Sequence, residues 1–379
     1  MTQHPKIPDA ATELAQMVAQ PFETARTMPP SVYTSEAFLK REIDQIFARE
    51  WVCIGRADGL ANPGDYVTMD LAGRPIMVVR RADGTLAAQS NVCLHRMTTM
   101  LEGEGNTKTI VCPYHAWTYG LDGALRGAPG MGRNDGFDRG DYCLPQIRCA
   151  DWLGWVMVSL NPDAPEPGEG LRDLEELIGT YRMETYGQTF REHHHWNTNW
   201  KVLAENFMES YHLPVCHAGT IGGFVDLEEM DCPPGGRNWN YHSLLKDPDA
   251  PLTNAHPDNT ELEGDLRRTT VLFTVYPSLL VTLTPGYFWY LSLLPDGVDH
   301  VKIIYGGGLS PDYVNDPESQ KHFAQLKSLL DRVNDEDRGC TEAVYKGLTS
   351  PFATAGHLSH LERPLYDFAT WINEKVQRG

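Results

Sequence analysis

The sequence predicts an α+β protein of two domains, in which a small all-β domain precedes a larger domain of mixed helices and strands. The chain has 379 residues, more than one average domain. From about residue 52 to 160, short β-rich runs such as YVTMDL and GWVMVSL alternate with turn sequences such as NPGD and LDG. The run NPDAPEPGEG at 161–170 is rich in Pro, Gly and acidic residues, so a domain boundary is expected there.

Periodic apolar residues predict four helices around these strands. The first covers Ser35 to Trp51, because apolar residues recur there at helical spacing with charges between them. Those apolar residues are Phe38, Ile43, Ile46 and Phe47. In the second domain we expect helices near 171–186, from about 200 to 212, and from about 318 to 346.

One uncharged stretch, Val271 to Pro295, is long enough to cross a bilayer but is interpreted as sheet core. Pro277, Pro285 and Gly286 interrupt it. Its Thr, Ser, Val, Tyr and Phe content favours buried strands joined by turns.

Charge and composition exclude several classes of function. Asp and Glu outnumber Lys and Arg by 51 to 32, a formal charge of −19, so phosphate backbones and anionic lipid surfaces would repel the chain. We therefore expect neither a nucleic-acid nor a membrane partner. The start MTQHPKIPDAATELAQ carries no export signal, which predicts a cytoplasmic protein. Eight cysteines are too few for a disulfide scaffold in a chain of this length.

The strongest motif is Cys93-Leu94-His95 followed, after sixteen residues, by Cys112-Pro113-Tyr114-His115. In a Rieske [2Fe-2S] centre two thiolates hold one iron and two imidazoles hold the other, which requires two Cys–His pairs. Two Cys and two His would also satisfy a structural zinc ion. Zinc fingers usually pair Cys with Cys and His with His, whereas here each short loop supplies one of each, so the spacing favours the Rieske cluster.

A second dense run of potential ligands spans Asn199 to His217, NWKVLAENFMESYHLPVCH. If this run opens as a helix, Glu205, Glu209 and His212 follow i, i+4, i+7 spacing and share one face. Pro214 would end that helix and allow His217 to turn back towards His212. A histidine pair alone is more often a satisfied part of the core, but the upstream cluster motif favours a metal site.

The third ligand of such a site would be a carboxylate. Asp337, in NDEDRGCTEAVYKGL on or near the last predicted helix, is the best candidate. With the two histidines it would form the 2-His-1-carboxylate triad of non-haem Fe(II) oxygenases, which leaves positions open for O2. Asp335 and Glu336 are competing ligands, and a solvated acidic helix face would explain all three without a metal.

At these two motifs the chain resembles the α subunits of Rieske non-haem iron oxygenases, from about Tyr33 to the C-terminus. The resemblance implies that Cys93, His95, Cys112 and His115 bind the [2Fe-2S] cluster. It also implies three domains: an N-terminal helical segment at 1–43 that packs on the catalytic domain, a Rieske domain at 44–160, and a catalytic domain at 161–379. The catalytic domain would hold an antiparallel sheet flanked by helices in a START/Bet v1-like helix-grip fold.

By the same resemblance, His212, His217 and Asp337 correspond to the ligands of the mononuclear iron, Asp337 because it lies ten residues before the Gly347 of a late Lys-Gly-Leu. Glu209 corresponds to an acid that carries electrons across the subunit junction of a homotrimer. Ring-hydroxylating members more often have Asp there, and the Glu form resembles the branch that acts on quaternary ammonium compounds such as carnitine, choline and glycine betaine. Electrons from NAD(P)H would come through a separate flavin and [2Fe-2S] reductase or a ferredoxin.

The expected substrate pocket uses aromatic residues, which can hold a methylated ammonium or stack on an aromatic ring, although most should be core. They are Phe273, Tyr276, Tyr287, Phe288, Trp289 and Tyr290, with Phe224, Trp239 and Tyr241 before them. We expect mono- or dioxygenation of a small organic substrate. The leading expectation for that reaction is N-demethylation or C–N cleavage of a quaternary-ammonium or betaine-like compound. The alternatives are hydroxylation of an aromatic ring or acid, with Arg267 or Arg268 pairing with a carboxylate, and a Rieske electron-transfer protein without oxygen chemistry.

Overall fold

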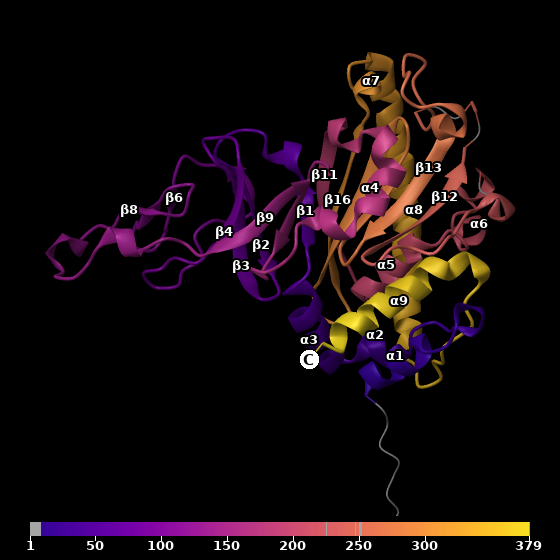
Figure 1. The fold of residues 1–379 in the computed structure, drawn as a ribbon, viewed down its shortest axis with the longest axis horizontal. Helices are drawn as coiled ribbons and strands as arrows, with labels where there is room; N and C mark the ends of the chain where they lie inside the picture. Colours follow the sequence, from indigo (N-terminus) through magenta and orange to yellow (C-terminus); the bar gives the residue numbers. More distant parts are fainter. Residues whose placement is uncertain (1–8, 225, 247, 250–251, 379) are drawn as a thin grey trace, which may run out of the picture. The chain divides into compact units, whose positions relative to one another are not determined.

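The computed structural model describes residues 9–378, except 225, 247 and 250–251, and the chain forms two compact units (Figure 1). Residues Phe47–Pro167 make up the smaller unit, and the larger one joins the chain before Phe47 to the chain after Pro167. The predicted α+β class is confirmed. The expected domain limits, 1–43, 44–160 and 161–379, remain predictions.

Antiparallel strands dominate the smaller unit. Its main sheet has the order β1-β10-β9-β4-β3-β2-β5, and β6, β7 and β8 form a second sheet. Two-residue turns at Ala72–Gly73 and Leu153–Gly154 have positive φ at both positions, the conformation that suits tight hairpins. The strands are β1 Val52–Arg56, β2 Asp65–Leu71, β3 Arg74–Arg80, β4 Leu86–Ser90, β5 Glu104–Asn106, β6 Ile110–Val111, β7 Thr118–Tyr119, β8 Leu125–Gly127, β9 Gln146–Trp152 and β10 Trp155–Ser159.

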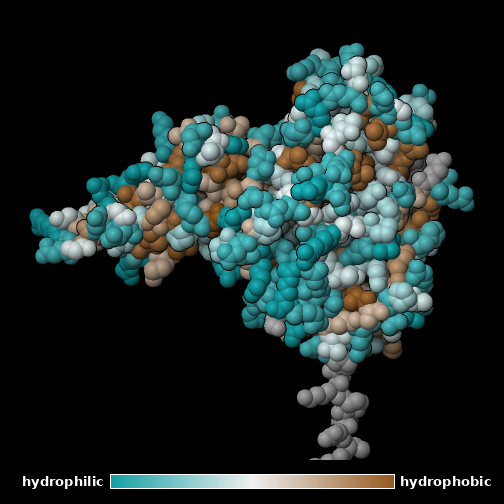
Figure 2. All heavy atoms as spheres, in the orientation of Figure 1, coloured by the Kyte–Doolittle hydropathy of each residue, from teal (hydrophilic) through white to brown (hydrophobic). Residues whose placement is uncertain are grey.

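A six-stranded antiparallel sheet forms the centre of the larger unit, in the order β11-β16-β15-β14-β13-β12. Its strands are β11 Gly187–Trp196, β12 Trp239–Leu245, β13 Thr269–Val275, β14 Leu279–Leu283, β15 Tyr287–Pro295 and β16 Val301–Leu309. The uncharged stretch is therefore β13 to β15, buried strands joined by turns, as predicted. Among the described residues, no helix combines the length and apolar content that a membrane crossing requires. Hydrophilic residues cover most of the visible face of this unit (Figure 2).

The α-helices belong to the larger unit: α1 Ala10–Val18, α2 Pro30–Thr34, α3 Glu36–Glu42, α4 Arg172–Ile178, α5 Trp200–Met208, α6 Leu213–Cys216, α7 Pro311–Val314, α8 Pro317–Leu348 and α9 Arg363–Val376. Helices α1 and α3 pack beside α9, and α2 packs against α1, α3 and α8 (Figure 1). Lys201 of α5 and Glu42 of α3 form a fully buried ion pair, with an Nζ–Oε1 distance of 2.9 Å. Removing one member of such a pair would cost about 3–5 kcal/mol, because the other charge would be left buried alone.

Helices α5 and α8 cover one side of the six-stranded sheet, called here the helix-facing side. Asn240 of β12 lies 3.3 Å from the sulfur of Met208 in α5, and Trp289 of β15 contacts the ring of Phe207 in α5. Tyr305 of β16 donates to Asp331 of α8 at 3.1 Å. Because side chains alternate along a strand and directly paired residues share a side, these contacts assign every paired position to one side of the sheet.

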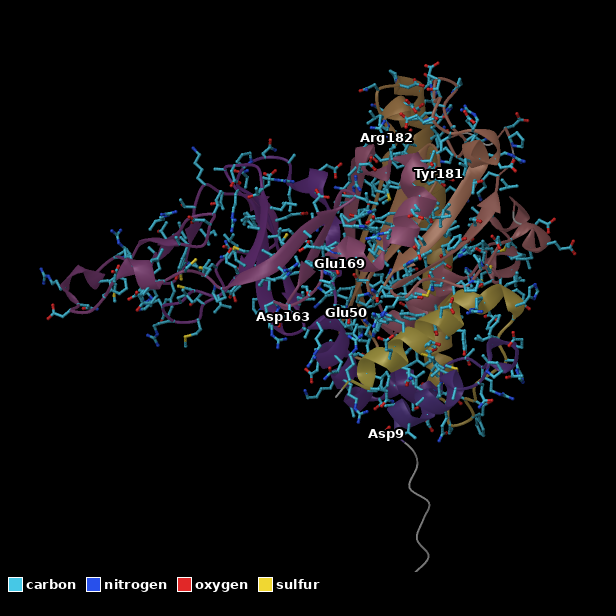
Figure 3. The ribbon with its side chains drawn as sticks, in the orientation of Figure 1. Asp9, Glu50, Asp163, Glu169, Tyr181 and Arg182 are labelled. Carbon is cyan, nitrogen blue, oxygen red and sulfur yellow. The ribbon has the colours of Figure 1, made fainter. Side chains whose placement is uncertain are left out.

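Two predicted helices are clearly shorter in the structure than expected. The first ends as α3 at Glu42 and continues as a π turn, Ile43–Phe47, after Ser35 caps its start. The helix expected near 171–186 ends at Ile178 as α4, because Arg182 takes a left-handed conformation, with φ of 53°. Tyr181 and Arg182 lie beyond this end (Figure 3).

The other two predicted helices lie closer to the observed ones. The helix expected from about 200 to 212 ends earlier, at Met208. The helix expected from about 318 to 346 is confirmed as α8, which Asp316 caps.

Candidate metal centres

Two loops of the smaller unit present Cys93 and Cys112 in the same backbone conformation. In each loop the cysteine N–H donates to the carbonyl five residues later, at 2.9 and 2.8 Å, and the cysteine carbonyl accepts from the N–H four residues later, at 3.0 and 3.1 Å. The residue at that fourth position, Met97 or Ala116, has a φ of 54° or 55°. The two halves of the motif are thus equivalent turns, which explains why each can present one Cys and one His.

The side chains of these loops combine buried thiols with more accessible imidazoles. Cys93 and Cys112 are 1% and 2% exposed, and the ring centroids of His95 and His115 are 4.7 Å apart. Nδ1 of His95 is buried and has no hydrogen-bond partner among the described residues. A buried nitrogen without a partner is costly unless a ligand or metal pairs with it, so this donor set fits a metal cluster.

Tyr119 contacts the same loop and was not singled out from the sequence. Its hydroxyl lies 3.4 Å from Cys93 Sγ and accepts from the N–H of Leu94 at 3.1 Å. Burial raises the pKa of Tyr119, so the hydroxyl keeps its proton and can donate it to the sulfur. Hydrogen bonds to cluster sulfurs tune the reduction potential. Only the fold reveals this contact, because Tyr119 lies on β7, outside both Cys–His pairs.

The second predicted site is built by a break in the chain between α5 and α6. Helix α5 ends at Met208, and Glu209 has an extended backbone, with φ of −132° and ψ of 155°. The prediction that Glu205, Glu209 and His212 share a helix face is therefore wrong. Pro214 does not end that helix but lies in the first turn of α6, with His212 just before α6 and His217 just after it.

His212, His217 and Asp337 lie close together. Oδ1 of Asp337 lies 3.0 Å from Nε2 of His217 and 3.4 Å from Nε2 of His212. Ligands bound about 2.1 Å from one metal ion at octahedral or tetrahedral angles lie roughly 3.0–3.4 Å apart, so the spacing fits one ion. His217 Nε2 and Asp337 Oδ1 are also buried without a hydrogen-bond partner among the described residues.

The arrangement of the ligand atoms also distinguishes the two candidate metal sites. Among the described residues, His212, His217 and Asp337 form the only group of at least three His, Cys or acidic residues whose ligand atoms all lie within 4.8 Å of one another. The four residues of the Cys–His loops do not meet that condition. A [2Fe-2S] cluster needs no single meeting point, because two thiolates hold one iron and two imidazoles hold the other.

Carboxylates orient both histidines from outside the site. Glu209 Oε1 lies 2.6 Å from Nδ1 of His212, and Glu336 Oε2 lies 2.7 Å from Nδ1 of His217. Thr220 donates to the same Glu336 oxygen at 2.6 Å. Each ring therefore directs its Nε2 inward, the usual arrangement around metal-bound histidines. The sequence had left Glu336 as a competing ligand, whereas the geometry places it behind His217; Asp335 is exposed.

The acidic surroundings change the pKa values of the candidate ligands. Burial opposes the charged form of His212, but Asp337 and Glu209 raise its pKa to about 10. Burial would raise the pKa of Asp337, but the two histidines hold it below its usual value. These side chains therefore favour a positive charge at the point where they meet, as a divalent cation would supply.

The predicted aromatic pocket residues are divided between the two sides of the sheet. Trp289 and Tyr287 lie on the helix-facing side, and Tyr287 contacts Phe323 of α8. The residues on the opposite side are Phe273, Phe288, Tyr290, Trp239 and Tyr241. Tyr276 packs against α9, and the side chain of Phe224 lies outside the described residues.

The two arginines proposed to bind an aromatic acid make other contacts. Arg267 donates to the backbone carbonyls of Asn259, Leu262 and His256. Arg268 donates to the carbonyl of Lys246 and to Asp265.

Comparisons with known proteins agree with this geometry. Residues 183–378 match the ring hydroxylating alpha subunit (catalytic domain) family, and residues 50–148 match the Rieske [2Fe-2S] domain. The carnitine monooxygenase oxygenase subunit of Escherichia coli (strain K12) is 28% identical over 88% of this chain and 86% of its own length. The chloroplastic choline monooxygenase of Arabidopsis thaliana is 27% identical over 97% of this chain and 88% of its own.

Solved structures share the fold over almost the whole chain. A quaternary ammonium Rieske monooxygenase in complex with L-carnitine has a TM-score of 0.78 and 23% identity, covering 99% of both chains. Naphthalene 1,2-dioxygenase from Rhodococcus sp., bound to indole, has a TM-score of 0.80 and 20% identity, covering 97% of this chain and 98% of its own. The catalytic-domain match excludes a mere electron carrier, and the chain belongs to the ring-hydroxylating α-subunit family: it is a Rieske non-haem iron oxygenase with a [2Fe-2S] cluster and a mononuclear iron.

Proposed function

We propose that this oxygenase oxidises a quaternary-ammonium or betaine-like compound by N-demethylation or C–N cleavage. The observation that carries the proposal is that relatives named for carnitine and choline align over 86–97% of this chain. The site supports it, because Glu209, Glu336 and Asp337 gather negative charge around the two histidines. A cationic substrate would be attracted to that charge, whereas an aromatic acid would be repelled.

The residues that would hold the metals follow from the two donor sets. Cys93, His95, Cys112 and His115 would bind the cluster. His212, His217 and Asp337 would bind the iron and leave adjacent positions open for O2. When bound, the cluster would supply single electrons and the iron would activate O2. His217 is fully buried and the Asp337 side chain is 13% exposed, which would limit the access of water to the reacting substrate.

Glu209 is the proposed electron bridge between subunits. Both of its carboxylate oxygens contact His212, one at the ring and one at the backbone N–H, at 2.6 and 3.0 Å. A cluster of a neighbouring subunit in a homotrimer could thus be coupled to His212 through one hydrogen-bonded side chain. A structural relative with a TM-score of 0.80 and 24% identity is described as revealing inter-subunit electron transfer.

The remaining partners follow from this chemistry. A separate flavin and [2Fe-2S] reductase or a ferredoxin would deliver electrons from NAD(P)H, and O2 would be the second substrate. We propose a cytoplasmic location because NAD(P)H is available there, which cell fractionation would test. Sedimentation of the iron-loaded protein would test the homotrimer, and a monomer would contradict it.

Metal analysis tests the site assignment directly. Iron, acid-labile sulfide and the EPR spectrum would be measured on anaerobically purified, dithionite-reduced protein and on the His212→Ala variant. We expect three irons per subunit with a Rieske signal, and two irons in the variant with the signal unchanged. Zinc without sulfide, or two irons in both proteins, would contradict the assignment.

Product analysis tests the substrate class. With reductase, NADH and O2, L-carnitine or choline should give formaldehyde or an aldehyde fragment together with an amine. A hydroxylated ring formed from an aromatic substrate, with no turnover of either ammonium compound, would favour the aromatic alternative.

A further inference from the structure

A row of four side chains crosses the helix-facing side of the sheet. The register pairs His242 with Leu272, Leu272 with Thr282, and Thr282 with Trp289. Directly paired residues point to the same side, so the four side chains form a continuous line across β12 to β15.

Three polar atoms of this row are buried without a hydrogen-bond partner among the described residues: His242 Nδ1, Thr282 Oγ1 and Trp289 Nε1. The three side chains are 1%, 6% and 8% exposed. A fourth such atom lies on α8, Nδ2 of Asn334, whose side chain is 4% exposed. An unpaired buried polar group is costly, so these four groups indicate a bound partner.

His242, Asn334 and Trp289 are connected to the iron site through neighbouring residues. The ring of His242 lies 2.7 Å from the hydroxyl of Ser210, which precedes His212 by two positions. Asn334 lies one helical turn before Asp337 on α8.

Trp289 connects to the site through α5. Its ring contacts Phe207, and the neighbouring Asn206 lies 3.3 Å from Nε2 of His212. These contacts link the helix-facing side of the sheet to the segment that carries His212.

The chemistry of the unpartnered atoms defines what they would bind. Trp289 Nε1 and Asn334 Nδ2 only donate hydrogen bonds, and the Thr282 hydroxyl can donate. None of them carries a charge, whereas the iron side of the site holds Glu209, Glu336 and Asp337. An oxygen acceptor would thus suit the sheet side, and a cation would suit the acidic side.

We propose that Thr282, Trp289 and Asn334 determine substrate specificity by donating hydrogen bonds to the carboxylate of a zwitterionic substrate, whose ammonium end lies towards the iron site. This inference rests on the proposed function and narrows it. It selects trimethylammonium compounds that carry a carboxylate over those that carry only an alkyl chain. The aromatic ring of Trp289 would also contact the alkyl part of the substrate.

Binding of a matched pair of ligands tests the proposal. γ-Butyrobetaine and butyltrimethylammonium differ mainly in the carboxylate, and their Kd values would be measured by calorimetry on the anaerobic, iron-loaded protein. The variants are Thr282→Val, which keeps the shape of the side chain but removes the donor, and Trp289→Phe, which removes the donor but keeps an aromatic ring. The control is Trp239→Phe, the same change on the opposite side of the same sheet.

We expect each variant to raise the Kd of γ-butyrobetaine about tenfold, the loss of one hydrogen bond to a charged acceptor. The Kd of butyltrimethylammonium should stay within about twofold, and the control should change neither value. Equal losses for both ligands, or no loss for either, would overturn the proposal. If the wild-type protein bound butyltrimethylammonium as tightly as γ-butyrobetaine, the inference would fail while the proposed function stood. If it neither bound nor oxidised any quaternary ammonium compound, both would fail.

A melting experiment without ligand gives an independent readout. Thr282→Val removes a buried hydroxyl that lacks a protein partner, so its melting temperature should equal or exceed that of the wild type. A clear decrease would show that the hydroxyl is paired within the protein, which would overturn its role as a free donor.

Discussion

The three successive acids of α8 allow a sharp test of the iron site, because each has a different environment. Asp337 Oδ1 lies 3.0 and 3.4 Å from the two histidine Nε2 atoms, Glu336 lies behind His217 at 2.7 Å, and Asp335 is exposed. We expect Asp337→Asn to lose the mononuclear iron, leaving the two irons of the cluster. Asp335→Asn, the same change two positions earlier, should retain all the iron.

Two substitutions of Glu336 test how much this carboxylate contributes to iron affinity. Glu336→Gln keeps an oxygen acceptor for Nδ1 of His217 but loses the charge, whereas Glu336→Ala removes the acceptor. Partners behind a metal-bound histidine contribute about 10–100-fold to metal affinity, so we expect about a tenfold loss for Gln and about a hundredfold loss for Ala. These factors correspond to roughly 1.4 and 2.7 kcal/mol.

Competition with a chromophoric chelator measures these affinities, and cluster absorbance shows whether the Rieske domain is intact. The reasoning would be refuted if Asp335→Asn released iron, or if both Glu336 variants bound iron as tightly as the wild type.

Three further results are expected. The pKa of His212 is raised to about 10, so the metal-free site holds a proton on His212 that iron must displace. Iron affinity should therefore rise at least about tenfold per pH unit from pH 6 to 8, and an affinity that does not change with pH would contradict this. Burial raises the pKa of Glu205 from 4.5 to about 8, so the stability it confers is complete below pH 4.5 and is lost as pH rises to 8. The free energy of unfolding, measured in urea, should therefore fall with pH by up to about 1.4 kcal/mol less per pH unit in Glu205→Gln than in the wild type. If the two proteins showed the same slope of unfolding free energy against pH, Glu205 would not be the source of the decline. Finally, the sulfurs of Cys216 and Cys340 are 2.9 Å apart, so hydrogen peroxide should join them as a disulfide with release of two waters, detected as a loss of two hydrogens by mass spectrometry that is absent in Cys216→Ser.

Features that depend on neighbouring residues could be predicted from the sequence. The Cys–His loops are short turns that carry their own ligands, so their spacing alone indicated a cluster. Helix α8 follows from apolar periodicity, and strands β13 to β15 follow from an uncharged stretch that prolines interrupt at the turns. His212 and His217 were candidates because Pro214 separates them in a run of potential ligands, and Asp337 was a candidate because the family resemblance places a carboxylate ligand ten residues before Gly347.

Features that depend on distant contacts were decided by the tertiary structure. Helical periodicity continues past Met208, yet the chain extends at Glu209, where its carboxylate binds His212. Asp335, Glu336 and Asp337 are chemically similar in sequence, and only the rotation of α8 against α6 assigns them to solvent, to His217 and to the centre of the site. The side of the sheet that Trp289 faces likewise follows from pairing with β14 and packing on α5. Local spacing therefore determined which residues were available for chemistry, whereas long-range packing decided which atoms meet, because hydrogen bonds and burial join residues far apart in the chain.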